Sequence, residues 1–248
     1  MRDLHTHTFY SDGKTSPEEM ILAAIEKGLS EIGISDHAYT FFDESYCMKK
    51  EKIPAYQAEI AALKEKYKGK ISVLCGVEQD AYSTESTAGF DYAIGSAHYL
   101  KRGEIYYPID CSKDGFLTLV SEGFDGDFYA VAEAYFSLMS AYAERDDAGI
   151  VGHFDLITKY NEGGALFDET HPRYLTAAKK AADKLIRAGK IFEINTGAIA
   201  RGYRTDPYPG KAIYEYLCAR GAKFLLSSDA HAPDNIAFRF DRYADLIR

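Results

Sequence analysis

Short apolar runs alternate with longer segments of helical periodicity along the whole chain. Seven of these runs are bounded by polar residues or glycine, which is typical of buried strands. The first run ends at Leu4. The others cover residues 31–35, 71–77, 90–97, 149–152, 190–194 and 223–227.

The segments between these runs carry helix signals. Ser16 is placed as an N-cap, with Pro17 at the first helical position and Gly28 at the end of the first predicted helix. Apolar spacing predicts further helices over 53–67, 127–145, 172–188 and 210–220, and a last one from about 233. Residues 100–114 show no period, so we expect a long loop there, with a hairpin at Arg102-Gly103.

This alternation predicts an α/β protein with a parallel sheet and right-handed crossovers. Seven strands without a large break favour a closed or nearly closed barrel, and the length favours one domain over residues 1–248. The alternative is an open, doubly wound sheet. Against it, no Gly-x-Gly-x-x-Gly follows the first strand, and polar residues with metal-ligand chemistry follow nearly every strand.

Composition narrows the class of protein. No apolar run approaches the about 18 residues that would cross a membrane, and the amino terminus carries no apolar secretory segment, so we expect a cytoplasmic protein. The four cysteines are scattered, which indicates neither a thiolate metal site nor a disulfide framework. The net charge of −9 argues against binding to nucleic acid. The sequence does not indicate an oligomeric state.

Histidines gather at the ends of the predicted strands. Six of the seven lie there, and His171 alone does not. His5 and His7 are one residue apart, so they point to the same face. In a barrel the carboxyl ends of the strands meet at one mouth, where we expect nine side chains. These are His5, His7, Asp12, His37, Glu78, His98, His153, Asp229 and His231.

So many imidazoles in one place are costly unless they bind metal ions. Neutral imidazole and carboxylate ligands suit zinc, iron or manganese. Nine ligands exceed what one ion takes, so we predict two or three divalent transition-metal ions.

The same residues resemble the polymerase and histidinol phosphatase (PHP) superfamily, with every motif in family order. The motifs are His5-Thr6-His7, Ser11-Asp12-Gly13, Asp36-His37, Glu78, His98, His153 and Asp229-Ala230-His231. The chain length and the stretches Gly152-His153-Phe154-Asp155-Leu156 and Glu193-Ile194-Asn195-Thr196 are similar to the histidinol-phosphate phosphatase branch.

The resemblance implies a distorted, TIM-like (β/α)7 barrel with three metal ions. His5, His7, Glu78 and Asp229 would hold the first ion, and Glu78, His98 and His153 the second. Asp12, His37 and His231 would hold the third. The branch usually has two adjacent basic residues after the sixth strand, and here they read Ala200-Arg201. By their positions, Arg201, Arg204 and Lys159 are the expected phosphate-binding residues.

The expected reaction is hydrolysis of a small phosphomonoester by a metal-bridging hydroxide, and the resemblance implies L-histidinol phosphate, a substrate of histidine biosynthesis. Glu78, Asp229 and His231 are the candidate catalytic residues, and either Asp229 or a water at the third metal would manage the proton. The alternative enzymes are a PHP phosphodiesterase or nucleotide phosphoesterase and a protein-tyrosine phosphatase. A non-enzymatic metal-binding module is the third interpretation.

Overall fold

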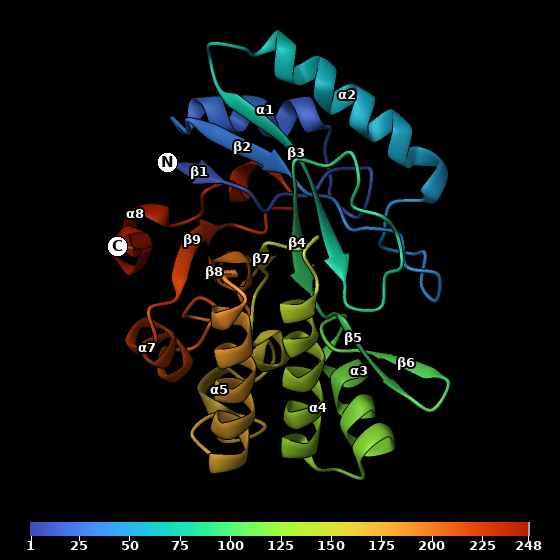
Figure 1. Ribbon diagram of the computed structural model, residues 1–248, viewed down its shortest axis with the longest axis vertical. Helices are drawn as coiled ribbons and strands as arrows, with labels where there is room; N and C mark the ends of the chain where they lie inside the picture. The colour runs from blue at the N-terminus through green and yellow to red at the C-terminus, as the bar shows by residue number, and fades with distance from the viewer. Residues whose placement is uncertain (248) are drawn as a thin grey trace.

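The computed structural model describes residues 1–247, and its centre is a sheet of seven strands. Every neighbouring pair is parallel, and the order is β1-β2-β3-β4-β7-β8-β9 (Figure 1). The strands are β1 (Arg2–Asp3), β2 (Glu31–Ile34), β3 (Ser72–Asp80), β4 (Tyr92–Ser96), β7 (Ile150–Val151), β8 (Ile191–Asn195) and β9 (Lys223–Ser227). All seven predicted strands are confirmed.

The sheet curls until its two edges meet. Just past β9, Ala230 forms a parallel bridge to Thr6, which lies just past β1. The His7 amide donates to the Ala230 carbonyl at 2.8 Å. Below this bridge the buried Asp3 carboxylate accepts hydrogen bonds from the amide and the hydroxyl of Ser228. The expected, nearly closed barrel is therefore confirmed, and the open-sheet alternative is wrong.

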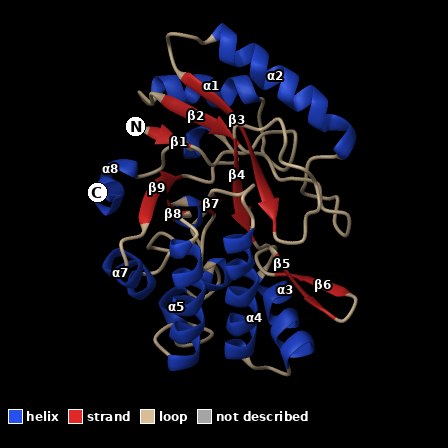
Figure 2. Ribbon diagram, in the orientation of Figure 1, coloured by secondary structure: helices blue, strands red, loops and turns tan. Residues whose placement is uncertain are grey.

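Helices cover the outside of the barrel (Figure 2). Ser16 is the N-cap of the first helix, as predicted, and it also forms a capping box with Glu19. Asp127 caps α4 with hydrogen bonds to two amides. The helices are α1 (Pro17–Glu26), α2 (Ile53–Lys66), α3 (Lys113–Thr118), α4 (Phe128–Ser140), α5 (Pro172–Arg187), α6 (Gly197–Ala200), α7 (Lys211–Ala219) and α8 (Phe240–Tyr243).

The structure differs from the sequence prediction at the last helix, at α3, and after β8, where the predicted loop contains the short helix α6. The prediction of one last helix from about 233 is wrong, because Ala237 and Arg239 have φ of 51° and 54°, which interrupts a right-handed helix. The segment instead contains the short α8 between two 3-10 turns, Pro233–Asn235 and Ala244–Ile247. The predicted hairpin is confirmed as β5 (Tyr99–Arg102) and β6 (Ile105–Pro108), but the α3 helix that follows was not predicted. No helix within residues 1–247 is long and apolar enough to cross a membrane.

Apolar side chains fill the interior of the barrel below its mouth. They come from six strands or strand ends: Leu4, Leu74, Tyr92, Ile94, Ile150, Ile191 and Leu225. The Tyr92 hydroxyl donates to the Leu4 carbonyl across the barrel. Gly33 and Gly76 leave room for this ring, since a Cβ on Gly76 would lie 2.5 Å from the ring carbon Cε1. Because side chains fill the interior, a site can form only at the mouth, where the carboxyl ends of the strands lie.

We expect Gly76→Ala to destabilise the protein by about 1–3 kcal/mol, because its methyl group would overlap the Tyr92 ring in a packed interior. Urea unfolding measures this difference. Gly149→Ala is the matched control, since a Cβ there meets nothing within 4 Å, and it should change stability by less than about 0.5 kcal/mol. Equal losses in the two variants would contradict this account of the packing.

Candidate metal centre

The carboxyl ends of the strands deliver the nine predicted residues to the mouth of the barrel. His5, His7 and Asp12 follow β1, and His37 follows β2. Glu78 is near the end of β3, and His98 and His153 follow β4 and β7. Asp229 and His231 follow β9. All nine lie in groups of His, Asp and Glu whose potential ligand atoms are within 4.8 Å of one another.

Glu78 lies at the centre of these groups, with only 1% of its surface exposed. Its Oε2 is 2.9 Å from His37 Nδ1, 3.2 Å from His5 Nε2 and 3.5 Å from His7 Nε2. Its Oε1 is 3.0 Å from His153 Nε2 and 3.4 Å from His98 Nε2. The two oxygens therefore face two different sets of imidazoles, which is the arrangement that a bridging carboxylate requires.

The potential ligands form four overlapping groups. They are His5, His7 and Asp229; His5, Glu78 and His153; His37, Glu78 and His98; and His7, Asp12, His37 and His231. The first group contains the ligands expected for the first metal, apart from Glu78. The last group contains all three ligands expected for the third metal, and His7 lies in both groups. The third-metal group is also the most open, because the Asp12 and His231 side chains are 36% and 22% exposed.

A second layer of carboxylates orients the histidines, and the sequence analysis gave these residues no role. Glu193 Oε1 lies 2.7 Å from His5 Nδ1, so this nitrogen donates and Nε2 stays free to bind a metal. Asp80 Oδ2 lies 3.4 Å from His98 Nδ1 and accepts the His98 amide at 2.8 Å. The period of two places Asp80 on the same face of β3 as Glu78. That spacing is the signal that could have identified it.

A further buried carboxylate, Asp36, shapes the loop that carries Asp12. It accepts hydrogen bonds from both the amide and the hydroxyl of Thr8, at 2.8 and 2.7 Å. It also accepts from the amide and the hydroxyl of Ser11, at 3.1 and 2.5 Å. A Cβ on Gly13 would overlap the His7 and Thr8 backbone. The Ser11-Asp12-Gly13 motif thus turns the chain back so that Asp12 faces the histidines.

The electrostatics of the centre couple its carboxylates to its imidazoles. Burial favours the neutral form of Glu78, but the imidazoles of His5 and His37 outweigh it and hold the pKa of Glu78 well below its usual range. Burial, with His231 and His37 as further causes, lowers the pKa of His7 to about 3, so His7 is neutral. Burial lowers the pKa of His5 and His37, but nearby carboxylates, Glu193 for His5 and Glu78 for both, outweigh it and raise the pKa of both imidazoles. A divalent ion that binds there must therefore displace their protons, whereas His7 is already neutral.

The donor atoms themselves also fit metal ions. His5 Nε2, His7 Nε2 and Glu78 Oε2 are all buried and have no hydrogen-bond partner within residues 1–247. Buried polar atoms without partners are rare in proteins, and here they converge on one another. A divalent ion would satisfy all three atoms.

A cavity of about 330 Å³ opens above the histidines. Lys159 and Arg201 line it. The Lys159 ammonium donates to the Asp110 carbonyl at 2.7 Å and to its carboxylate at 3.1 Å. Arg201 donates to the Asp229 carboxylate at 2.7 Å and to its carbonyl at 2.9 Å. Each cation therefore already holds an acidic residue, and each retains further N–H groups.

Arg204, the third predicted phosphate ligand, is not among the residues that line this cavity. Its side chain is 9% exposed and donates to the Thr158 carbonyl and to Glu169. The structure therefore brings Lys159 and Arg201 to the mouth and leaves Arg204 behind it.

An aromatic wall forms one side of the cavity. Tyr46 and Tyr99 line it, and the Tyr46 ring centre lies 4.9 Å from that of His37. Phe42 stacks on Tyr106 of the β5–β6 hairpin with ring centres 3.9 Å apart. The Tyr99 hydroxyl donates to Asp43 at 2.5 Å. These contacts fix the loop after β2 against the hairpin.

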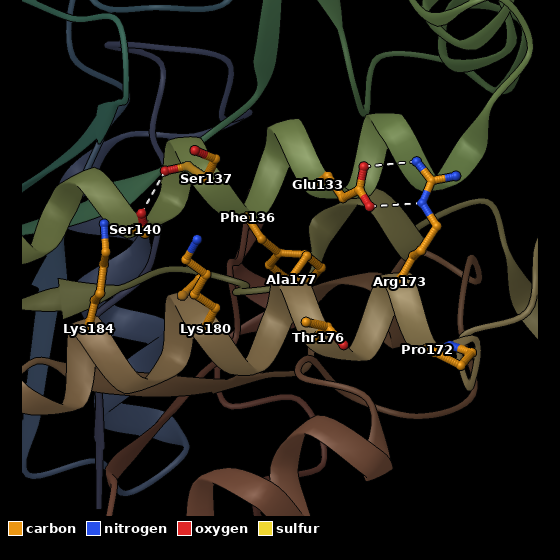
Figure 3. Close-up of a pocket in the computed structure, with 11 residues that line it drawn as sticks. Glu133, Phe136, Ser137, Ser140, Pro172, Arg173, Thr176, Ala177, Lys180 and Lys184 are labelled. Atoms are coloured by element: carbon orange, nitrogen blue, oxygen red, sulfur yellow. Dashed lines mark hydrogen bonds and ion pairs between the residues drawn. The ribbon is translucent and has the colours of Figure 1, made fainter.

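His171 lies away from the mouth, as the sequence predicts. It caps α5 and stacks on Tyr129 with ring centres 3.8 Å apart. A separate groove of about 540 Å³ runs between α4 and α5. Figure 3 shows that the Arg173–Glu133 ion pair bridges it. The groove contains none of the nine clustered residues, so it is not part of the candidate centre.

Comparisons with known proteins identify the family of the chain. The PHP domain family matches residues 3–197. A relative from Deinococcus radiodurans, named "Probable histidinol-phosphatase", is 31% identical, and the match covers 99% of this chain and 91% of that protein.

Two solved structures share the fold. A candidate histidinol phosphatase from Listeria monocytogenes has a TM-score of 0.87 at 22% identity, covering 98% of this chain and 100% of that one. Histidinol phosphate phosphatase from Lactococcus lactis, complexed with zinc, L-histidinol and phosphate, has a TM-score of 0.75 at 20% identity and covers 99% and 92%. The chain belongs to the PHP domain family, in its histidinol-phosphatase branch.

Proposed function

We propose that this protein is a metal-dependent phosphomonoesterase that hydrolyses L-histidinol phosphate to L-histidinol and phosphate. The observation that carries the proposal is the position of Glu78, whose two oxygens face separate sets of imidazoles below a cavity lined by Lys159 and Arg201. The names of the relatives and the ligands in the Lactococcus lactis structure support this choice of substrate. Action as one domain over residues 1–248 and a cytoplasmic location stay predictions.

The nine clustered residues would hold two or three divalent ions, zinc, iron or manganese, with Glu78 shared between two of them. Such ions lower the pKa of water and neutralise phosphoryl oxygens, which is the chemistry that hydrolysis of a phosphate ester needs. His5 would be held in the metal-binding tautomer by Glu193, which accepts from its Nδ1.

The cations at the mouth would bind and orient the phosphate. The Lys159 ammonium has three N–H donors, and the carbonyl and the carboxylate of Asp110 each accept one of them. The third donor would be left for a phosphoryl oxygen. Arg201 would use its remaining N–H groups in the same way. Both cations also offset the repulsion between the substrate dianion and an acidic chain.

Proton transfer involves the groups around Asp229. Burial favours the neutral form of this carboxyl, but Arg201 and His5 outweigh it and hold the pKa of Asp229 well below its usual range. Asp229 would therefore stay ionised as a metal ligand and hydrogen-bond acceptor. His231 Nδ1 lies 2.9 Å from the Asp229 carbonyl oxygen and 3.3 Å from Arg201 Nη1, and its Nε2 lies 3.3 Å from Asp12 Oδ1.

The cavity wall suits the alcohol that leaves. L-histidinol carries an ammonium group and an aromatic ring. Tyr46 and Tyr99 line the same cavity as Asp43 and Asp110, so aromatic rings and carboxylates are both near the expected position of the alcohol. Hydrolysis consumes one water molecule. The water oxygen bonds to phosphorus as the bond to the alcohol oxygen breaks, and one of the water protons goes to the alcohol oxygen.

A substrate panel with the metal-loaded protein tests the proposed function. We expect L-histidinol phosphate to be hydrolysed with a kcat/KM at least about 100-fold above that of p-nitrophenyl phosphate, because the wall adds binding energy for its alcohol. Bis-(p-nitrophenyl) phosphate and a phosphotyrosine peptide should be poorer still. If either of these is preferred, the phosphodiesterase or the protein-tyrosine phosphatase interpretation replaces ours. If none is hydrolysed, the protein is a metal-binding module.

We expect Glu78→Gln to lose metal and to lower turnover by more than about 100-fold. This exceeds the loss typical of residues that only hydrogen-bond to a metal ligand. The neutral amide keeps the size of the side chain but loses the charge that two ions would share. Elemental analysis and a phosphate-release assay measure the two effects. His171→Ala, which lies outside the mouth, is the control and should match the wild type in both, so similar losses in the two variants would contradict the site assignment.

A further inference from the structure

The cavity cation Lys159 sits at the end of a short, buried turn. Residues Leu156–Thr158 form one 3-10 turn after β7, and Lys159 follows it. Thr158 is fully buried and Lys159 is 8% exposed. Lys159 lines the cavity from the end of this turn, so the position of the turn sets where its side chain starts.

Arg204 fastens this turn from behind. Its Nη1 donates to the Thr158 carbonyl at 2.7 Å and to Glu169 Oε1 at 2.9 Å. Arg204 belongs to the loop after β8, the same loop that carries Arg201. One guanidinium therefore ties together the two loops that bring cations to the cavity.

The partners of Arg204 are themselves fixed. Glu169 Oε1 also accepts the side-chain amide of Asn161 at 2.9 Å. Asn161 is fully buried, and its carbonyl oxygen accepts the amides of Leu166 and Phe167. Because Glu169 is itself held by Asn161, the Arg204 guanidinium that it pairs with has a fixed position next to the Thr158 carbonyl. Removing it would take away one of the two hydrogen bonds that the buried Thr158 carbonyl accepts, and the other, from the Asn161 amide at 2.9 Å, would remain.

We propose that Arg204 is a positioning residue, which fixes the turn before Lys159 and thereby places the Lys159 ammonium for phosphate binding. This inference rests on the proposed function of the site. Arg204 contacts no substrate in this account, which differs from the direct phosphate contact that its sequence position suggests.

A double-mutant cycle with Arg204→Met and Lys159→Met tests this proposal. Lys159→Met should lower kcat/KM for L-histidinol phosphate by about 10- to 100-fold, the effect of losing one charge-assisted hydrogen bond. Arg204→Met should lower it by about tenfold, mainly through KM, with metal content unchanged. Added to Lys159→Met, Arg204→Met should cause no further loss, because the group that it positions is already absent.

Two controls separate this role from general destabilisation. Arg220→Met removes an exposed guanidinium that pairs with Asp183 and should leave kcat/KM unchanged. Glu169→Gln weakens the anchor while keeping Arg204, and it should show the same non-additivity with Lys159→Met. It serves if Arg204→Met does not fold.

A second readout does not depend on turnover. The Kd of the metal-loaded protein for inorganic phosphate, measured by calorimetry, should follow the same cycle. Losses that add in the double variant would overturn the proposal, since Arg204 would then contact the phosphate itself or act on the whole fold. Failure of the proposed function is distinguishable, because the wild type would then bind phosphate without hydrolysing L-histidinol phosphate.

Discussion

The structure depends on bringing five imidazoles around one buried carboxylate, that of Glu78. Glu78 is 1% exposed, and its oxygens approach histidines from β1, β2, β4 and β7. Such a cluster forms only if distant parts of the chain end at the same place. Closure of the sheet at Thr6 and Ala230 achieves this, and the apolar interior below it holds the strands in register. The barrel and the centre are thus parts of one arrangement.

Pairing of charges is the second feature of the mouth. Lys159 is held by Asp110, and Arg201 is held by Asp229. Each pair keeps a long side chain in one orientation, so less conformational entropy remains to be lost when a phosphate binds. Arg201 also links the cavity to Asp229, one of the nine clustered residues. The pairs explain how an acidic chain can present cations to an anionic ester.

Much of this arrangement could be predicted from the sequence. The strands have a strong apolar signal, and ligands at strand ends converge in any parallel barrel, so all nine residues of the cluster were identified. Glu193 and Asp80 were missed as orienting groups, because a carboxylate at a strand end does not reveal which histidine nitrogen it faces. Arg204 was expected in the cavity, but a loop position does not give the direction of a side chain. The prediction of the last helix was wrong because the chain adopts left-handed φ angles at Ala237 and Arg239, where no glycine in the sequence indicates them.

Anomalous diffraction from crystals of the zinc-loaded protein tests the central claim most directly. The account predicts two or three zinc peaks at the mouth, with two of them on opposite oxygens of Glu78. One would be shared with His98 and His153, and the other with His5 and His7. A single peak that does not touch Glu78, or peaks only at surface histidines such as His171, would contradict the account.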